Sequence, residues 1–267
     1  MTQVGIRTDK GRVREGNEDS YGSEPRINLF VLSDGMGGLD SGEVASRIAV
    51  DTVLAHCRMA DETPSLPLTG KRIEGASEMS NRLASAIRLA NASVQQAALE
   101  RGALNGMGAT VVAVQFAGDR MSVAHVGDSR VYRLRGDKFE QLTDDHSFVA
   151  DQVRQGNMTE TEASGSNLKN ILIRALGVEP EVEVDTRDEV LKENDTILLC
   201  SDGLTRDLSD NQIAAVLSET EDPQEAADHL VCLANEAGGG DNITAIVLRR
   251  DDKPAGALGR LSQWLKV

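Results

Sequence analysis

Aromatic residues and long apolar runs are both scarce in this 267-residue chain. Only 3% of the residues are aromatic, which leaves few rings on which nucleic-acid bases would stack. No run approaches the roughly 18 to 20 apolar residues that span a bilayer. The N-terminus begins with a mixed polar strand rather than a charged and then apolar leader. We therefore expect a cytoplasmic protein without a membrane span.

Cysteine is scarcer still, with three residues against seven aromatic ones. The three cysteines, Cys57, Cys200 and Cys232, are odd in number, lack metal-ligand spacing and lie in apolar contexts. Reduced core thiols are the simplest interpretation, and no disulfide framework is implied.

Positive charge is also in short supply, because 28 lysines and arginines face 43 aspartates and glutamates, for a net charge of −15. Such a balance argues against binding to a phosphate backbone, so we do not expect nucleic acid as a partner. Most of the excess acid predicts a solvated surface, whereas acids gathered at one site would attract divalent cations. With 40% hydrophobic residues, the chain is long enough for one large domain.

Four short turns contain the acids of greatest interest. Each taken alone indicates only a tight turn, because Asp, Asn and Gly are ordinary turn residues. However, buried-strand patterns run directly into Asp34 and Asp202, and several carboxylates at one rim of a sheet predict a bound hard cation. The four turns are Asn17-Glu18-Asp19, Asp34-Gly35-Met36-Gly37-Gly38, Ser201-Asp202-Gly203 and Gly240-Asp241-Asn242.

Hydrophobic periodicity predicts an α+β layered domain. Helices are expected over residues 41–59, 78–101, 209–218 and 223–237, and strands over 3–8, 27–33, 182–187, 196–201 and 242–249. A period-two stretch over 109–116, 121–126, 130–135 and 139–142 predicts an antiparallel meander. Because strands and helices come in blocks, antiparallel sheets covered by helices are favoured over a doubly wound parallel sheet.

Seven motifs in order make the chain, over about residues 5–249, resemble the bacterial PP2C-type (PPM) metal-dependent protein serine/threonine phosphatases. Any one motif is weak, but the series is specific. The motifs are Arg14-Glu15-Gly16-Asn17-Glu18-Asp19, Asp34-Gly35-Met36-Gly37-Gly38, Gly108-Ala109-Thr110, Val126-Gly127-Asp128-Ser129-Arg130, Arg174-Ala175-Leu176-Gly177, Ser201-Asp202-Gly203-Leu204 and Gly240-Asp241-Asn242-Ile243-Thr244. The resemblance implies two packed antiparallel β-sheets flanked by helices on both sides, an α-β-β-α sandwich, with a dinuclear Mn²⁺ or Mg²⁺ site at one end.

The resemblance also implies roles for individual residues. Asp34 bridges the two metals, Asp202 and Asp241 complete one of them, and the Gly35 carbonyl reaches the other. The remaining implied residues are Asp19, a direct or water-mediated contact; Glu18, near the metals; Asp128, which with Asp202 holds a third, weaker ion; and Arg14, a clamp for the phosphate. For Asp128, a hairpin-turn acid remains the competing interpretation.

The implied reaction is hydrolysis of phosphoserine and phosphothreonine in proteins by a metal-bridging water or hydroxide, counteracting a serine/threonine kinase. The implied partners are phosphorylated proteins and that kinase, and we expect a monomer. Many eukaryotic members have a histidine where this chain has Met36, and methionine cannot protonate a leaving group. We therefore predict that the rate is more sensitive to leaving-group pKa.

The residues argue against two other classes of hydrolase. A cysteine phosphatase needs a Cys-x5-Arg sequence, which is absent. A Ser-His-Asp hydrolase is poorly supported too, because the four histidines lie near no nucleophile-elbow sequence. Within the superfamily, a regulatory phosphatase dedicated to one phosphorylated partner, as in sigma-factor pathways, is the runner-up. From another class, a noncatalytic pseudophosphatase that binds a phosphoprotein is the rival.

We expect a phosphatase domain over residues 1–250 that includes a flap subdomain over about 145–177. In this flap, Ser166-Asn167 stands where the family often has His-Pro, so substrate contacts are expected near Ser166. Residues 251–267 read as a linker and a short amphipathic C-terminal tail, in which Leu258, Leu261, Trp264 and Leu265 fall near one helical face.

Overall fold

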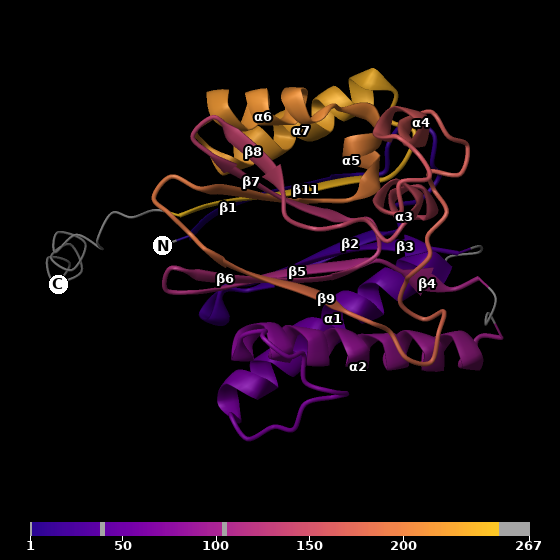
Figure 1. Cartoon of the computed structure of the whole chain (residues 1–267), viewed down its shortest axis with the longest axis vertical. Coiled ribbons are helices and arrows are strands. Elements are labelled where there is room, and N and C mark those ends of the chain that lie inside the picture. Colours follow the sequence, from indigo (N-terminus) through magenta and orange to yellow (C-terminus); the bar gives the residue numbers. More distant parts are fainter. Residues whose placement is uncertain (1, 38–40, 103–105, 251–267) are drawn as a thin grey trace, which may run out of the picture.

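A computed structural model describes residues 2–37, 41–102 and 106–250 of the chain. Gly38 and the predicted C-terminal tail over 251–267 lie outside the described residues. Figure 1 shows two sheets stacked face to face, with helices over both outer surfaces. This arrangement confirms the predicted α-β-β-α sandwich.

The first sheet has the strand order β1-β11-β10-β7-β8. Every pairing in it is antiparallel. Its strands are β1 (Thr2–Asp9), β7 (Arg130–Arg135), β8 (Lys138–Gln141), β10 (Thr196–Cys200) and β11 (Ile243–Arg250). All five residues of β10 are buried, as its unbroken apolar sequence predicted.

The second sheet has the order β2-β3-β5-β6-β9, and a short strand β4 pairs with β3. Its pairings are also antiparallel. Its strands are β2 (Asp19–Glu24), β3 (Leu29–Met36), β4 (Gly108–Ala109), β5 (Val111–Ala117), β6 (Arg120–Val126) and β9 (Asp185–Val190).

Three apolar layers hold the sandwich together. The middle layer lies between the sheets and includes Leu32, Val112, Leu199 and Ile246. One outer layer packs α1 (Ser41–Glu62) and α2 (Glu78–Glu100) on the second sheet, and the other packs α5 (Asp202–Asp207), α6 (Asp210–Glu219) and α7 (Pro223–Ala237) on the first. Each fully buried aliphatic side chain contributes roughly 1.5–3 kcal/mol.

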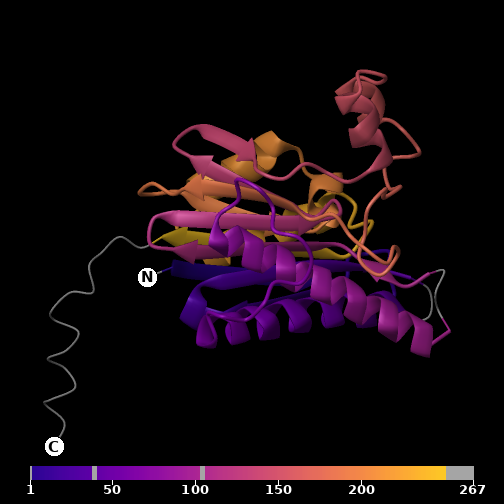
Figure 2. The ribbon, with the colours of Figure 1, turned by 60° about the horizontal axis from the view of Figure 1, so that its bottom comes forward.

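Two short helices, α3 (Phe148–Arg154) and α4 (Glu160–Ser164), belong to the predicted flap and project from the sandwich (Figure 2). Each has a hydroxyl N-cap, Ser147 for α3 and Thr159 for α4. In Figure 1 they lie at the opposite end of the sandwich from the N-terminus.

The predicted meander is wrong at its centre, because the chain changes sheet between β6 and β7. Strand β6 pairs with β5 and β9, whereas β7 pairs with β8 and β10. A period-two pattern reports which face of a strand is buried but not which strand lies beside it. The crossover uses Gly127, whose φ of +105° favours glycine.

Other expectations need smaller corrections. The 3₁₀ turn η1 (Pro25–Ile27), the strand β2 and the helix α5 were not predicted, and the strand expected over 182–187 is β9, which starts at Asp185. Cys57 and Cys200 are buried, and burial raises the pKa of each thiol to about 12, but Cys232 is exposed.

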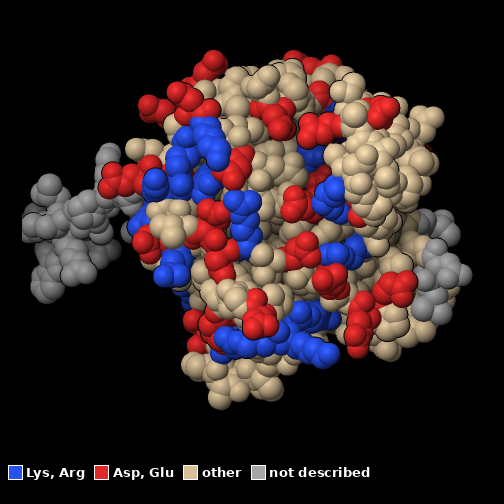
Figure 3. All heavy atoms as spheres, viewed as in Figure 1, with Lys and Arg blue, Asp and Glu red and all other residues tan. Residues whose placement is uncertain are grey.

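Among the described residues, no helix is both long and apolar enough to cross a membrane. Acidic and basic side chains are interspersed over the face in Figure 3, as expected for a solvated surface.

Candidate active site

The predicted acids gather where β3, β10 and the segment before β11 end. Asp34 lies on β3, and Asp19 on β2 is its partner in the antiparallel register. Asp202 begins α5 directly after β10 and Ser201, while Asp241 stands two residues before β11. Segments far apart in the sequence therefore bring four aspartates to one end of the sandwich.

Asp19 joins the two sheets through one of its carboxylate oxygens. Its Oδ2 accepts hydrogen bonds from Ser201 Oγ at 2.8 Å and Thr244 Oγ1 at 2.6 Å. Thr244 lies on β11 of the other sheet, and Ser201 directly follows β10 of that sheet. Its Oδ1 is buried and has no hydrogen-bond partner. A buried, unpartnered carboxylate oxygen is costly, and a nearby cation would compensate it.

The guanidinium of Arg206 pairs with both Asp202 and Asp241, a role that was not predicted from the sequence. Arg206 Nη2 lies 3.0 Å from Asp202 Oδ2, and its Nη1 lies 2.8 Å from Asp241 Oδ2. The spacing of Asp202 and Arg206 on α5, four residues apart, was the available signal. Arg14 Nη2 reaches the same Asp241 oxygen at 2.9 Å, with half of its own side chain exposed.

These side chains surround a cavity of about 210 Å³. Five carboxylates of its lining face the two guanidiniums of Arg14 and Arg206, so negative charge is left in excess. The charged and polar residues of the lining are Arg14, Glu18, Asp34, Thr110, Asp128, Asn170, Asp202, Arg206, Asp241 and Asn242. A larger groove of about 590 Å³ continues from Asp128 and Asp202 beneath the flap.

The pKa shifts of these acids have a common cause. Burial raises the pKa of Asp19 to about 7, although the hydroxyls of Thr244 and Ser201 oppose the shift. Burial also raises the pKa of Asp128 to about 7, with Asp202 adding to it. Burial and the neighbouring Asp19 and Asp202 raise the pKa of Asp34 well above its ordinary value. Carboxylates in this state bind protons or metal cations readily.

Close backbone packing fixes Gly35 and Glu18. The Gly35 N–H donates to the Glu18 carbonyl at 3.1 Å, and a Cβ on Gly35 would lie 2.0 Å from the Gly42 carbonyl oxygen. The Glu18 carboxylate lies against the first turn of α1, 2.6 Å from where a Cβ on Gly42 would stand. A Cβ on Gly35 would therefore require a backbone shift, whereas a Cβ on Gly42 would require only the end of the Glu18 side chain to move.

Asn242 is a second residue whose role was not predicted. Its Oδ1 accepts from the Glu18 N–H at 2.8 Å, and its Nδ2 donates to the carbonyls of Lys10 and Gly16 at 3.0 and 2.9 Å. It thereby holds the loop that carries Arg14 and Glu18 against Asp241.

The flap contributes Asn170 and Leu172 to the cavity and Lys169 and Asn170 to the groove. Ser166, the predicted contact, is not part of either lining, and its Oγ accepts from the Leu168 N–H at 3.1 Å. Met36 does line the cavity. Among the described residues of that lining there is no histidine, cysteine or lysine.

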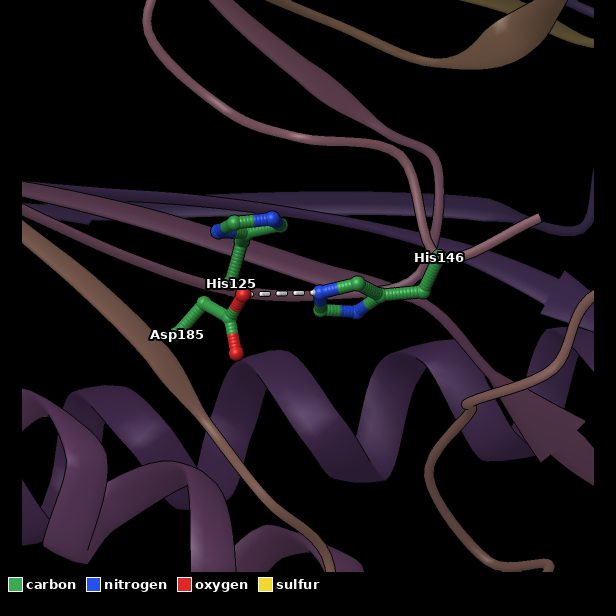
Figure 4. A group of neighbouring side chains, drawn as sticks. All are labelled: His125, His146 and Asp185. Atoms are coloured by element: carbon green, nitrogen blue, oxygen red, sulfur yellow. Dashed lines mark ion pairs between the residues drawn. The ribbon is translucent and has the colours of Figure 1, made fainter. Parts of the chain in front are cut away.

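A second cluster has the composition of a metal site but not the electrostatics. His125, His146 and Asp185 offer ligand atoms within 4.8 Å of one another (Figure 4). However, Arg174 Nη1 lies 2.6 Å from Asp185 Oδ1, so a guanidinium already supplies the positive charge. His146 Nδ1 accepts from the Gly127 N–H at 3.0 Å, and His125 Nε2 lies 2.9 Å from the Asp144 carbonyl. The aspartate cavity is the better candidate for divalent cations.

Comparison with known proteins places this geometry in a family. A family model for protein phosphatase 2C matches residues 11–234. The chain is 40% identical over 249 residues to the serine/threonine phosphatase stp of Listeria innocua, and the match covers 92% of this chain and 95% of that protein. The chain therefore belongs to the protein phosphatase 2C family, which confirms the predicted enzyme class, a serine/threonine protein phosphatase.

Solved structures agree with the fold. The crystal structure of the Mycobacterium tuberculosis serine/threonine phosphatase PstP/Ppp is similar, with a TM-score of 0.81 at 34% identity, over 94% of this chain and 99% of that one. The PstP catalytic domain in complex with two manganese ions has a TM-score of 0.78 at 35% identity, over 93% of this chain and 97% of that one.

Proposed function

We propose that the aspartate cavity is the active site and that it hydrolyses phosphoserine and phosphothreonine in proteins with two Mn²⁺ or Mg²⁺ ions. One observation carries the proposal: an unpartnered buried oxygen of Asp19 stands beside a cavity in which five carboxylates face two guanidiniums. Carboxylate and carbonyl oxygens are the donors that Mg²⁺ and Mn²⁺ prefer, so the residues fit these ions.

The ligands we assign are those expected from the sequence. Asp34 would be shared by both ions, Asp202 and Asp241 would hold one, and the Gly35 carbonyl would reach the other. Glu18 and Asp19 would support them, and Asp128 with Asp202 would hold a third, weaker ion. Two divalent cations close together supply an acidified water as nucleophile and neutralise the phosphoryl oxygens.

The side chains then divide the remaining tasks. Arg14 is half exposed and lies at the rim, so its planar guanidinium is free to turn from Asp241 to two phosphate oxygens. Arg206 is more buried and pairs with both Asp202 and Asp241, so we assign it to holding these acids in place. Met36 stands beside the cavity with no proton to give, so the greater sensitivity to leaving-group pKa stays a prediction.

The domain and partner assignments follow from this site. Residues 1–250 form the phosphatase domain in this proposal, with the flap over about 145–177 bordering the groove that would receive the substrate protein. The substrates are phosphorylated proteins, and the enzyme opposes a serine/threonine kinase. The groove carries charges of both signs, including Lys169, Arg154 and Glu160, so recognition of polar protein segments is expected there.

The test is hydrolysis of p-nitrophenyl phosphate and of a phosphothreonine peptide with Mn²⁺, with Mg²⁺ and with EDTA. We expect metal-dependent release that Asp34→Asn or Asp202→Asn abolishes while the fold is kept. Asp228→Asn is a matched control, because Asp228 is half exposed on α7 and its ion pair with Arg7 spans a long 3.9 Å. Full activity in either site variant would reject the site, and no release by folded, metal-loaded protein would favour a noncatalytic binding protein.

A further inference from the structure

The cluster of His125, His146 and Asp185 lies outside the proposed active site but is connected to it. His146 is buried at the start of the flap, and its ring stacks on His125 at a centroid distance of 4.7 Å. Figure 4 shows the His146 ring pointing at the Asp185 carboxylate of β9, and the Nε2 to Oδ2 distance is 3.2 Å.

The partners of His146 determine its tautomer. A backbone N–H can only donate, so the contact from Gly127 N to His146 Nδ1 at 3.0 Å makes Nδ1 the acceptor. The ring proton is then on Nε2, which faces Asp185 Oδ2. Arg174 Nη1 is 3.0 Å from Nε2, but both atoms are donors, and the guanidinium donates to Asp185 Oδ1 at 2.6 Å instead.

The backbone of His146 contacts Gly127 a second time and also contacts the end of the flap. Its N–H donates to the Gly127 carbonyl at 3.0 Å. Together with the ring contact, His146 therefore forms hydrogen bonds with both the N–H and the carbonyl of Gly127. Its carbonyl accepts from the Ile173 N–H at 2.9 Å, next to Leu172, which lines the cavity. One residue thus joins the start of the flap, the end of the flap and the turn between the two sheets.

That turn leads directly to the proposed site. Gly127 precedes Asp128 and packs so closely on Thr110 that a Cβ on Gly127 would lie 2.6 Å from the Thr110 side chain. The Thr110 hydroxyl is 2.7 Å from Ser129 Oγ and accepts from the Asp34 N–H at 3.0 Å. A displacement of the turn would therefore move both Asp128 and the backbone of Asp34.

We propose that His146, held in its Nε2–H tautomer by Asp185, is a positioning residue that sets the Gly127 turn and the base of the flap relative to the proposed active site. The proposal rests on the proposed function of that site. An aspartate behind a histidine orients the ring in the same way in many enzyme and metal sites, where removing such an outer partner typically costs about 10- to 100-fold in activity or metal affinity.

Asp185→Asn is the decisive variant. Arg174 can only donate, so the amide oxygen of the new side chain turns to Arg174 and its NH₂ faces His146 Nε2. The ring proton must then move to Nδ1, where it meets the Gly127 N–H, and the hydrogen bond between His146 and Gly127 is lost. Volume and packing are almost unchanged.

Two variants of His146 separate its two contacts. The side-chain oxygen of His146→Asn can take the position of Nδ1 and accept from Gly127, whereas the amide of His146→Gln reaches the position of Nε2 and contacts Asp185. Asp188→Asn is the control, because Asp188 lies on the same strand and accepts from Ser77, Ser80 and Ser122, away from the site.

The experiment combines ¹⁵N spectra of the His146 ring and the Gly127 amide with kinetics on a phosphothreonine peptide in Mn²⁺. We expect the wild type to show the Nε2–H tautomer, and Asp185→Asn to show Nδ1–H, a shifted Gly127 amide and a kcat/KM about 10-fold lower or more. His146→Gln should resemble Asp185→Asn, whereas His146→Asn and Asp188→Asn should stay near wild type.

A wild-type ring in the other tautomer, or equal losses in Asp185→Asn and Asp188→Asn, would overturn the proposal. Equal losses of kcat/KM in His146→Asn and His146→Gln would also overturn it. A general structural role of the side chain would affect both variants alike, whereas the proposed role requires an acceptor for the Gly127 N–H. Wild-type protein without metal-dependent turnover would instead count against the proposed function, since the ring and amide spectra report positioning without any turnover.

Discussion

Asp19 on β2 lies directly opposite Asp34 on β3 in the antiparallel register. Like charges placed opposite each other destabilise a sheet, and here burial adds to the cost, since it raises the pKa of Asp19 to about 7 and that of Asp34 well above its ordinary value. Hydroxyls of Ser201 and Thr244 compensate only one Asp19 oxygen. The arrangement disfavours folding and favours cation binding.

Asp19→Asn should therefore stabilise the protein in EDTA while weakening its response to metal. At about pH 8 we expect a free energy of unfolding that is higher by on the order of 1–3 kcal/mol, because a buried negative charge is removed. The stabilisation by Mn²⁺ should shrink. Urea unfolding with EDTA and with Mn²⁺ measures both effects, and a variant that is less stable in EDTA yet responds fully to Mn²⁺ would contradict the argument.

Stability without added metal should fall as pH rises. The pKa values of Asp19 and Asp128 in the folded protein are about 7, above the ordinary 3.8, so the folded state binds more protons between these values. The corresponding stability is complete below pH 3.8 and is lost as pH rises through about 7.

The measurement is the melting temperature at about pH 5 and about pH 8, with EDTA and with Mn²⁺. Because metal ions replace the protons, the stabilisation by Mn²⁺ should grow with pH. Asp19→Asn is the control, and it should reduce the pH dependence in EDTA to the part that Asp128 contributes. Equal Mn²⁺ stabilisation at both pH values would argue against these carboxylates as ligands.

Gly35→Ala should destabilise the fold, because the added Cβ would lie 2.0 Å from the Gly42 carbonyl oxygen. Backbone must shift to relieve this contact, at a cost of roughly 1–3 kcal/mol or more. Gly16→Ala is matched to it, since nothing lies within 4 Å of the added Cβ there. Denaturant unfolding of both variants tests the prediction, which fails if they lose equal stability.

Arg206→Gln and Arg14→Gln should change different properties of the enzyme. Losing Arg206 removes the cation that pairs with Asp202 and Asp241, so Mn²⁺ affinity should rise several-fold while stability in EDTA falls. Losing Arg14 should lower kcat/KM for the phosphopeptide by about 10- to 100-fold, because one charge-assisted contact to the phosphate is removed. The affinity for Mn²⁺ should not fall. Calorimetric titration and steady-state kinetics separate the two, and a shared signature would refute the division of roles.

The sequence by itself determined the apolar runs that lead into Asp34 and Asp202 and the family to which the chain belongs. Unbroken apolar runs before Asp34 and Asp202 predicted buried strands, and both strands are found as β3 and β10. Hydrophobic periodicity is a local property of the sequence, so it predicts an element without information about which elements pack against it. Helix α7 was therefore predicted with its observed bounds.

Only the tertiary structure decided which acids and cations meet. Periodicity gives a strand's buried face but not its neighbour, so the predicted meander missed the change of sheet at Gly127. For the same reason, the contacts of Asp19 with Ser201 and Thr244 and the link of Arg206 to Asp241 were not predicted. No sequence motif distinguished His146, because its ring acquires a role only where the flap, β9 and the Gly127 turn converge.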